Sequence, residues 1–469
     1  MEKFTLVNGS TDLKNVSKDS VSDSASSGND DENCRSPSTM KSTQGVKLWL
    51  AVMLIIGEMA GTGVLSLPRA VVNCGGPLGI VLLLFLGGVA AYTGITLGWC
   101  WQILEERFEE YRTHHVQDPY NAIGYRAAGN AGRYIVSVCN GVANFSAGIV
   151  LLLLSSEMVH GLLVDLLPDM SMCLWMVVIA ILLIPMSWIG TPKDMWFIAV
   201  GATLSTALAC VLVLSNILLL IPKTSRIVKR SDVELKPFLS AFGIITFAFC
   251  GHMVFPTIQH DMVDGKKFSW AIILGFSGML TMFVPVALAA YTVLGDAVSD
   301  NVLTVVQRLD HDGSEAGITT AVQVLLTCHL VLGFHIILNP LHQELEKLFK
   351  VKNEFCFRRV LVRSCLVVLV LFLCETIPKF GPIMSFIGGS FINMIVFLLP
   401  PVFYELLCRG DERFPKIAVP LHIRVIHVEI LLIGVLAGGA SCYSAVNEIF
   451  APGSFVMPCY INVTIGQIK

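Results

Sequence analysis

The chain has 469 residues, of which 54% are hydrophobic and only 14% are charged. Charged residues make up about a quarter of an ordinary soluble domain, so this composition excludes that class and indicates a membrane protein. The formal net charge is −3 and no basic face stands out, which argues against a nucleic-acid partner.

The fourteen cysteines raise the question of disulfides or a metal site. Cys-x-x-Cys and His-Glu-x-x-His patterns are absent, and no nucleophile–base spacing appears, so we expect neither a metal cofactor nor an enzyme. Most of the cysteines stand singly in apolar runs, where the residue ordinarily acts as a small hydrophobe: Cys100, Cys139, Cys210, Cys250, Cys328, Cys365, Cys374 and Cys442.

The chain divides into a polar tail, a hydrophobic domain and a short final tail. Residues 1–45 are rich in Ser, Asp, Asn and Lys, which predicts a disordered cytosolic segment. Residues 46–450 form the predicted transmembrane domain, and 451–469 a short luminal or extracellular tail. Eleven apolar segments can each span a bilayer, at about 20 residues per span. They lie near 47–73, 78–104, 133–156, 172–190, 195–221, 238–259, 269–295, 317–338, 360–377, 383–407 and 424–447.

The basic residues set the expected orientation. With a cytosolic N-terminus, 23 of the 32 Lys and Arg residues fall on the inner side, as the positive-inside rule requires. The outward loop 222–237 is the contrary feature, because it carries five basic residues. The sequon at Asn462 lies on the predicted outer side, where it is available for glycosylation.

The first span contains an unusual stretch, Gly57 to Pro68, with three glycines, Glu58 and a proline inside the hydrophobic window. Glycine and proline weaken a helix, and a broken helix in hydrocarbon is tolerated where its backbone lines a cavity. We therefore expect a discontinuous first span. The alternative is that the glycines form a packing face for close helix approach.

The sixth span repeats this signal, because Gly251 precedes Pro256 by five residues, just as Gly63 precedes Pro68. Matching interruptions in the first span of each half point to an inverted repeat with a central site. Spans one to five and six to ten then form the two repeats, and span eleven is an addition.

Two breaks would offer opposite partial charges to a ligand. The amides of Gly61, Thr62 and Gly63 would suit a carboxylate, because they would begin a half-helix. The carbonyls around Phe249–Gly251 would suit an ammonium group or cation. This combination fits a zwitterionic amino acid better than a sugar or an inorganic ion.

Glu58 and His252 are the ionisable members of the two stretches. A carboxyl group at membrane depth is costly and usually functional, so we expect Glu58 to bind and release a proton during transport. The alternative is a structural pairing of Glu58 with a backbone amide or with His252. For His252 two roles are open: it can bind substrate or a proton, or it can form a structural hydrogen bond.

Other intramembrane polar residues give weaker signals. Asn140 and Asn144 share one face of span three and can line the pathway or bond between helices. On span eight, Thr327 and His329 are candidates, and Thr327 is the predicted sodium ligand if the coupling ion is sodium. A hydroxyl that bonds its own helix is the common alternative for Thr327.

Four stretches resemble the amino acid/auxin permease family: Gly-Thr-Gly-Val-Leu-Ser-Leu-Pro at 61–68, Phe-Ala-Phe-Cys-Gly-His-Met-Val-Phe-Pro-Thr-Ile-Gln-His-Asp-Met at 247–262, Tyr-Thr-Val-Leu-Gly-Asp at 291–296 and Pro-Tyr-Asn-Ala-Ile-Gly-Tyr-Arg-Ala-Ala-Gly at 119–129. The resemblance implies an all-α membrane protein with a LeuT-like inverted repeat of five plus five helices and one extra C-terminal helix. It places the substrate between 57–63 and 249–252. The implied substrate contacts, with Asn144 added from span three, are Gly57, Met59, Gly61, Thr62, Gly63, Phe249, Cys250, Gly251, His252 and Asn144.

We therefore expect a secondary active transporter of neutral amino acids, coupled to protons, with sodium coupling as the alternative. Spans one, two, six and seven would move against the rest. Apart from the co-transported ion, no cofactor is expected. The rival hypothesis is an amino-acid sensor that signals through a cytosolic partner of the N-terminal tail. The expected location is the plasma membrane or an endolysosomal or vesicular membrane.

Overall fold

The computed structural model describes residues 45–461, except for 115, 117, 189–195, 225–227, 231, 310–315, 352–355, 378–379, 411–412, 452–458 and 460. This part of the chain is helical, with one isolated bridge between Val46 and Met262. The predicted tail 1–45 falls outside it except for Gly45, and so do Asn462 and most of the predicted tail 451–469.

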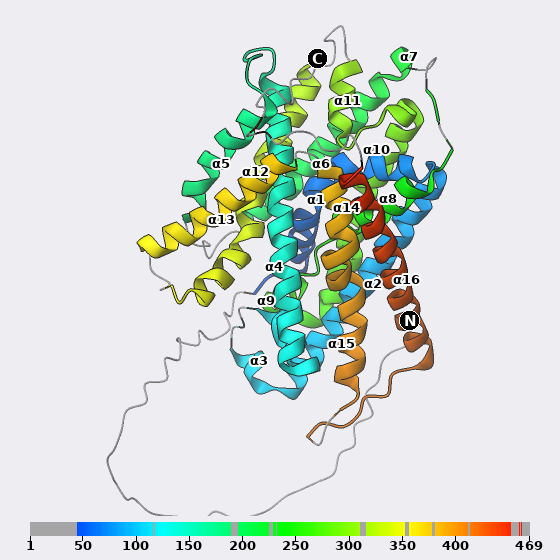
Figure 1. Cartoon of the computed structure of the whole chain (residues 1–469). Helices are drawn as coiled ribbons and strands as arrows, with labels where there is room; N and C mark the ends of the chain where they lie inside the picture. The colour runs from blue at the N-terminus through cyan, green and yellow to red at the C-terminus, as the bar shows by residue number, and fades with distance from the viewer. Residues whose placement is uncertain are drawn as a thin grey trace, which may run out of the picture. The chain divides into compact units, whose positions relative to one another are not determined.

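The helices follow the predicted segments in order (Figure 1). The first repeat contains α1 (Leu48–Asn73), α2 (Pro77–Arg107), α3 (Glu109–Thr113), α4 (Pro119–Leu163), α5 (Met172–Trp188) and α6 (Trp196–Leu219), and α7 (Ile221–Thr224) follows it. The second contains α8 (Leu235–Ala248), α9 (Phe255–Asp261), α10 (Phe268–Leu294), α11 (Val302–Leu309), α12 (Ala316–Leu348), α13 (Phe357–Thr376), α14 (Phe380–Ile387) and α15 (Leu399–Cys408). The extra helix is α16 (Leu421–Ile449), and short helical turns lie at Gly265–Lys267, Gly295–Ala297, Gly388–Ile392 and Met394–Leu398.

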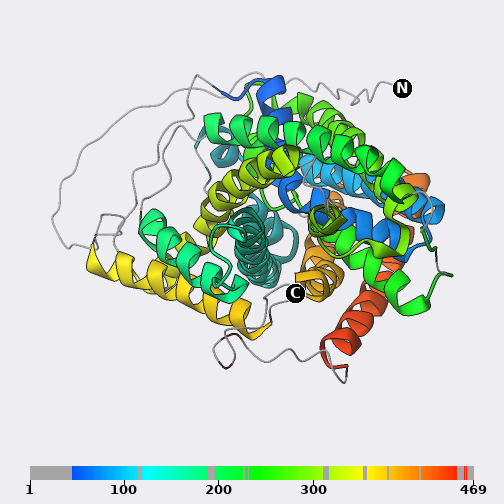
Figure 2. The same ribbon diagram turned by 90° about the horizontal axis from the view of Figure 1, so that it is seen from above.

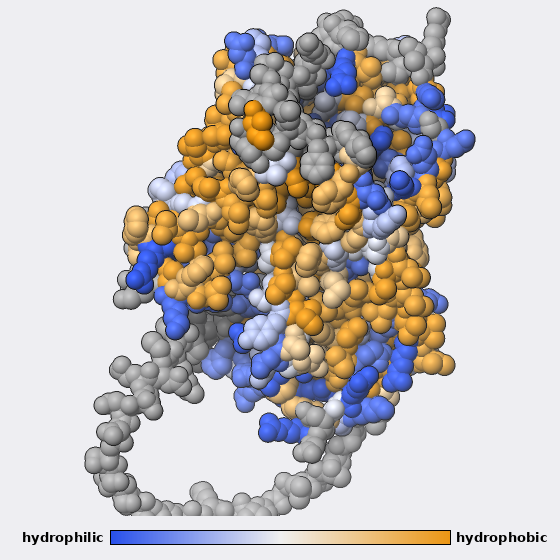
Figure 3. All heavy atoms as spheres, viewed as in Figure 1, coloured by the Kyte–Doolittle hydropathy of each residue, from blue (hydrophilic) through white to orange (hydrophobic). Residues whose placement is uncertain are grey.

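The composition of the helices fits a bilayer. Eight helical segments of the described chain are long and apolar enough to span a membrane, and two shorter apolar helices are Met172–Trp188 and Leu235–Ala248. Hydrophobic side chains cover the middle of the face seen in Figure 3, and hydrophilic side chains gather towards its ends. The protein is therefore an integral membrane protein, as its composition predicts.

The predicted break in the first span is wrong, because α1 is one continuous helix from Leu48 to Asn73. Its glycines instead allow large neighbours to approach. A methyl group placed on Gly63 would lie 2.9 Å from the ring of Phe283, and one placed on Gly61 would collide with His329. The alternative prediction, that the glycines form a face on which neighbouring helices pack closely, is confirmed for this helix.

The predicted break in the sixth span is confirmed. Helix α8 ends at Ala248, and α9 begins at Phe255 with Pro256 in its first turn. Tight turns connect them, since the Gly251 amide donates to the Phe249 carbonyl at 3.0 Å. Proline at the start of a helix loses no internal hydrogen bond, which explains why the chain resumes its helix there.

Helix α1 lies in the middle of the bundle, where it packs against α6, α8 and α10 (Figures 1 and 2). The α8–α9 turn is supported from behind by aromatic rings. Phe249 stacks on Phe276 of α10 with centroids 5.8 Å apart, and Phe255 contacts the same ring edge-on at 6.2 Å. These rings fix the direction in which the turn faces.

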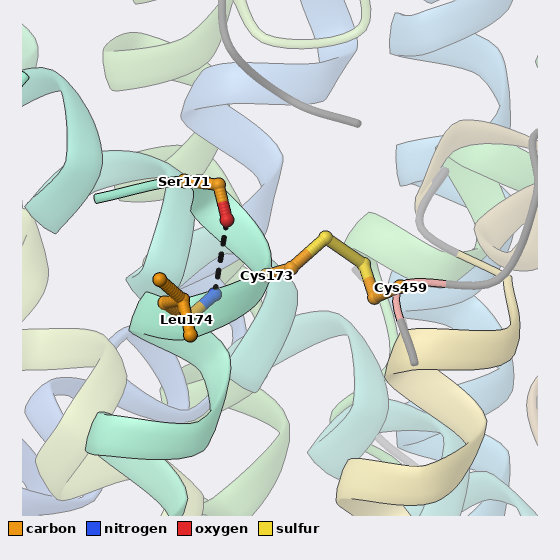
Figure 4. Close-up of a disulfide and its surroundings, with 4 residues drawn as sticks. All are labelled: Ser171, Cys173, Leu174 and Cys459. Carbon is orange, nitrogen blue, oxygen red and sulfur yellow. Dashed lines mark hydrogen bonds between the residues drawn. A yellow bond between two sulfur atoms is a disulfide. The ribbon is translucent and has the colours of Figure 1, made fainter. Parts of the chain in front are cut away.

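Helices α5 and α13 are held together near both of their ends. At one end, Cys173 of α5 forms a disulfide with Cys459, and the Cys459 amide donates to the Glu375 carbonyl of α13 at 2.9 Å (Figure 4). At the other end, the indole of Trp188 donates to the Ser364 hydroxyl at 2.9 Å. The cysteine analysis did not identify the disulfide, because 286 residues separate the two thiols in sequence.

A buried ion-pair cluster strengthens the second of these ends. The guanidinium of Arg363 is fully buried and contacts the Glu346 carboxylate of α12 at 2.6 Å. It also donates to the Ser187 carbonyl of α5 at 2.7 Å. Arg359 contacts the same carboxylate at 3.1 Å. Such a cluster is costly to disrupt, because losing one partner leaves a buried charge uncompensated.

Candidate functional site

A cavity of about 330 Å³ lies beside the middle of α1. Its walls come from α1, α4, α6, α8, α9, α12, the α8–α9 turn and the helical turn at Gly388–Ile392. The lining residues are Leu54, Gly57, Glu58, Met59, Gly61, Thr62, Ala147, Leu151, Ala202, Phe247, Cys250, Met253, Val254, Ile258, His329, Leu332, Gly333, Ile336, Ile337 and Ile392. Most of these side chains are aliphatic.

Glu58 and His329 bring a carboxyl group and an imidazole into this apolar lining. None of the ion pairs found among the described residues involves Glu58. A carboxylate at membrane depth needs a proton, a cation or hydrogen-bond donors to offset its desolvation. Glu58 is therefore placed to receive such a partner from the cavity.

His329 is held in a defined orientation. Its Nδ1 shares a hydrogen bond of 3.2 Å with the hydroxyl of Thr206 on α6, and Thr206 is itself buried. Its Nε2 faces α1 at Gly61, where only a glycine leaves room for the ring. The imidazole thus bridges α6 and α1 and presents its remaining edge to the cavity.

The structure places six of the predicted α1 and α8–α9 residues on the cavity: Gly57, Glu58, Met59, Gly61, Thr62 and Cys250. It places four others elsewhere. Gly63 packs on Phe283, Gly251 packs on Phe255, and Phe249 is buried against Phe276. Asn144 is buried in α4 and is not among the residues that line the cavity.

His252 does not meet Glu58 in this arrangement. Its ring is fully buried on the α2 side of the turn, where Nε2 shares a hydrogen bond of 3.1 Å with the Thr93 hydroxyl. The ring also lies 4.8 Å from that of Phe255. The structural alternative for His252 agrees with these contacts. The pairing of Glu58 with His252, which was the structural alternative for Glu58, is absent from the described part of the chain.

Thr327 lies on α12, two residues before His329, and does not line the cavity. Its hydroxyl is buried without a hydrogen-bond partner among the described residues. The predicted sodium role of Thr327 stays a prediction.

Most of the cavity wall contributed by α12 could not be predicted from the sequence. Leu332, Ile336 and Ile337 are ordinary aliphatic residues of a span, and only His329 marked this helix as a candidate. Ile392 could not have been found, because it reaches the cavity from a π-helical turn. The sequence feature that identified cavity residues was an ionisable residue inside an apolar span.

A second, polar cavity of about 320 Å³ lies at the end of α1 that is predicted to face outwards. Arg69 lines it and donates to the Val298 carbonyl at 2.7 Å. Glu234, Lys236 and Asp300 also line it. Its charged walls contrast with the aliphatic central cavity and are suited to contact with water.

The chain matches the family model described as transmembrane amino acid transporter protein over residues 44–444. The chain belongs to this family. Its relatives include the Arabidopsis thaliana amino acid transporters AVT1D and AVT1H. AVT1D is 24% identical over 83% of this chain and 68% of its own length. AVT1H is 26% identical over 78% and 84% of the two chains.

Solved structures show the fold of this amino acid transporter. MhsT in complex with L-phenylalanine superposes with a TM-score of 0.57 at 12% identity, covering 84% of this chain and 98% of MhsT. An Eremococcus coleocola manganese transporter gives a TM-score of 0.58 at 14% identity, covering 92% and 93%. The LeuT-like fold predicted from the sequence is confirmed, and the family is one of transporters, not enzymes.

Proposed function

We propose that this amino acid transporter is a proton-coupled symporter of neutral amino acids that works by alternating access. The observation that carries the proposal is the joint placement of Glu58 and His329 in one central cavity with aliphatic walls. A carboxyl group in such a place becomes neutral when it binds a proton. Because burying the charged form is costly, proton binding and closure of the cavity favour each other, and this couples proton binding to transport.

The substrate is proposed to be zwitterionic and uncharged overall. A cavity with one carboxyl group, one imidazole and aliphatic walls has few groups to neutralise a charged substrate side chain. Because α1 is continuous, most of the amides expected to bind the substrate carboxylate are used inside the helix. We assign that carboxylate to the Thr62 hydroxyl, and the ammonium group to carbonyls near Cys250.

The position of His329 favours protons over sodium as the coupling ion. The ring occupies the space between α1 and α6 at Gly61. Hard cations prefer oxygen ligands, whereas the imidazole offers ring nitrogens, so this part of the lining is poorly suited to sodium. Sodium coupling near Thr327 is the alternative.

The disulfide supports the proposed orientation. Disulfides persist in oxidising compartments, so Cys173 and Cys459 belong on the luminal or extracellular side. This is the side on which the basic residues place the 451–469 segment. The N-terminal tail is then cytosolic.

The test is uptake of radiolabelled neutral amino acids into proteoliposomes under an imposed proton gradient or, separately, a sodium gradient. One proton per substrate allows about tenfold accumulation per pH unit, because one unit corresponds to about 1.4 kcal/mol. Glu58→Gln should abolish this accumulation while allowing exchange of internal for external substrate. His329→Gln should lower both processes.

Glu429→Gln is the matched control, because Glu429 is an exposed glutamate on α16, outside the cavity. This variant should accumulate substrate as the wild type does. Accumulation by Glu58→Gln under a proton gradient would contradict the proposed proton role, and accumulation driven only by sodium would replace it with the alternative. Saturable binding without flux under either gradient would favour a sensor.

A further inference from the structure

A separate groove of about 530 Å³ lies between the last turn of α12 and the first half of α13. These segments are at the edge of the bundle in both ribbon views (Figures 1 and 2). The lining residues are Leu345, Phe349, Val351, Arg358, Leu361, Val362, Cys365, Leu366 and Leu369. None of them lines the central cavity, so the groove is not part of the transport site.

The groove has the polarity and length of a lipid chain site. Apart from Arg358 and Cys365, its walls are aliphatic or aromatic, and Phe349 and Leu361 remain 60% and 52% exposed. From Arg358 to Leu369 the helix advances about 16 Å, at about 1.5 Å per residue. One leaflet of a bilayer contributes about 15 Å of hydrocarbon, so the groove can hold an acyl chain along much of its depth.

The mouth of the groove is cationic. Arg358 lines the groove, and Lys350 lies between the lining residues Phe349 and Val351; both are exposed, and neither forms an ion pair with a described carboxylate. The other basic residues nearby already form ion pairs: Arg359 and Arg363 contact Glu346, and Lys347 contacts Asp118 at 2.9 Å. Two available cations above an apolar groove complement a lipid with an anionic headgroup.

We propose that this groove binds one anionic glycerophospholipid of the cytosolic leaflet. The acyl chain lies along Leu361, Cys365 and Leu369, and the phosphate faces Arg358 and Lys350. The α12–α13 connection is on the predicted inner side, where anionic lipids concentrate. The proposal is independent of the transported substrate and of the coupling ion.

Native mass spectrometry of the full-length protein tests the headgroup preference, with phosphatidylserine and phosphatidylcholine as the two probes. Phosphatidylserine should bind more tightly. Each basic residue at a membrane surface contributes about fivefold, so Arg358→Gln with Lys350→Gln should weaken phosphatidylserine binding about 25-fold. Arg409→Gln with Lys416→Gln removes two exposed inner-side charges outside the groove and should leave binding unchanged.

A phosphatidylserine with a photoreactive acyl chain tests the position of the tail. It should label the 361–369 segment of the wild type, and Leu361→Trp, which fills the groove, should remove that labelling. Equal affinity for the two lipids, unchanged affinity in the Arg358/Lys350 variant, or labelling confined to other helices would each overturn the proposal.

Discussion

At the residue scale, the site depends on which way each ionisable side chain faces. Glu58 could be identified from the sequence because it is an ionisable residue inside an apolar span, although that span was expected to break there. The direction in which His252 faces could not be predicted, because this residue lies in the α8–α9 turn, where no periodicity applies, and it faces Thr93. His329 replaces it in the cavity.

The contact between Gly61 and His329 gives a prediction at this scale. Gly61→Ala should lower the rate of transport at least tenfold, because the added methyl group collides with Nε2 of the imidazole and displaces the ring from Thr206. The measurement is the initial rate of uptake together with the melting temperature of the purified protein.

Gly88→Ala provides the control for Gly61→Ala. A methyl group there meets no atom within 4 Å, so this change in α2 should leave transport intact. It should also stabilise the helix slightly, because alanine is favoured over glycine by about 1 kcal/mol in a helix interior. Normal uptake by Gly61→Ala would show that the position of His329 is unimportant.

At the element scale, the two stretches with a glycine five residues before a proline have similar sequences but different structures. Gly63 and Pro68 lie in a continuous α1, whereas Gly251 and Pro256 flank a true break. The stretch with more glycines is the one that stays helical, so local propensity does not decide the outcome and tertiary packing does. The order and extent of the spans were predictable because a bilayer imposes a minimum apolar length, but the continuity of α1 was not.

The Arg363 cluster gives a prediction for the elements α5, α12 and α13. Arg363→Met should destabilise the protein by about 3 kcal/mol, because it leaves the buried Glu346 carboxylate with less compensation and the Ser187 carbonyl without its donor. Arg359→Met should cost less, since Arg359 is more exposed than Arg363. Melting temperatures of the two purified variants test this order, and the reverse order would contradict the assignment of Arg363 as the central member.

At the scale of the whole molecule, the proposed alternating access requires a fixed part and a moving part. The disulfide and the Arg363 cluster hold α5 and α13 together near both ends, so these helices are suited to a scaffold. The cavity is lined by α4, α6 and α12 as well as by α1 and the α8–α9 turn, and by no described residue of α5 or α13. Alternating access then requires α8 to move relative to its neighbours, among which is α14.

The contact between α8 and α14 makes this requirement testable. The hydroxyls of Ser240 and Ser385 are 2.9 Å apart, so a Ser240→Cys, Ser385→Cys double variant should form a disulfide between the two helices. Oxidation should stop transport while substrate binding persists, and reduction should restore it. The wild type treated with the same reductant controls for loss of the Cys173–Cys459 bond, and each single variant controls for the loss of one hydroxyl. Continued transport by the fully cross-linked protein would mean that α8 and α14 move as one body, and the boundary between scaffold and moving part would then lie elsewhere.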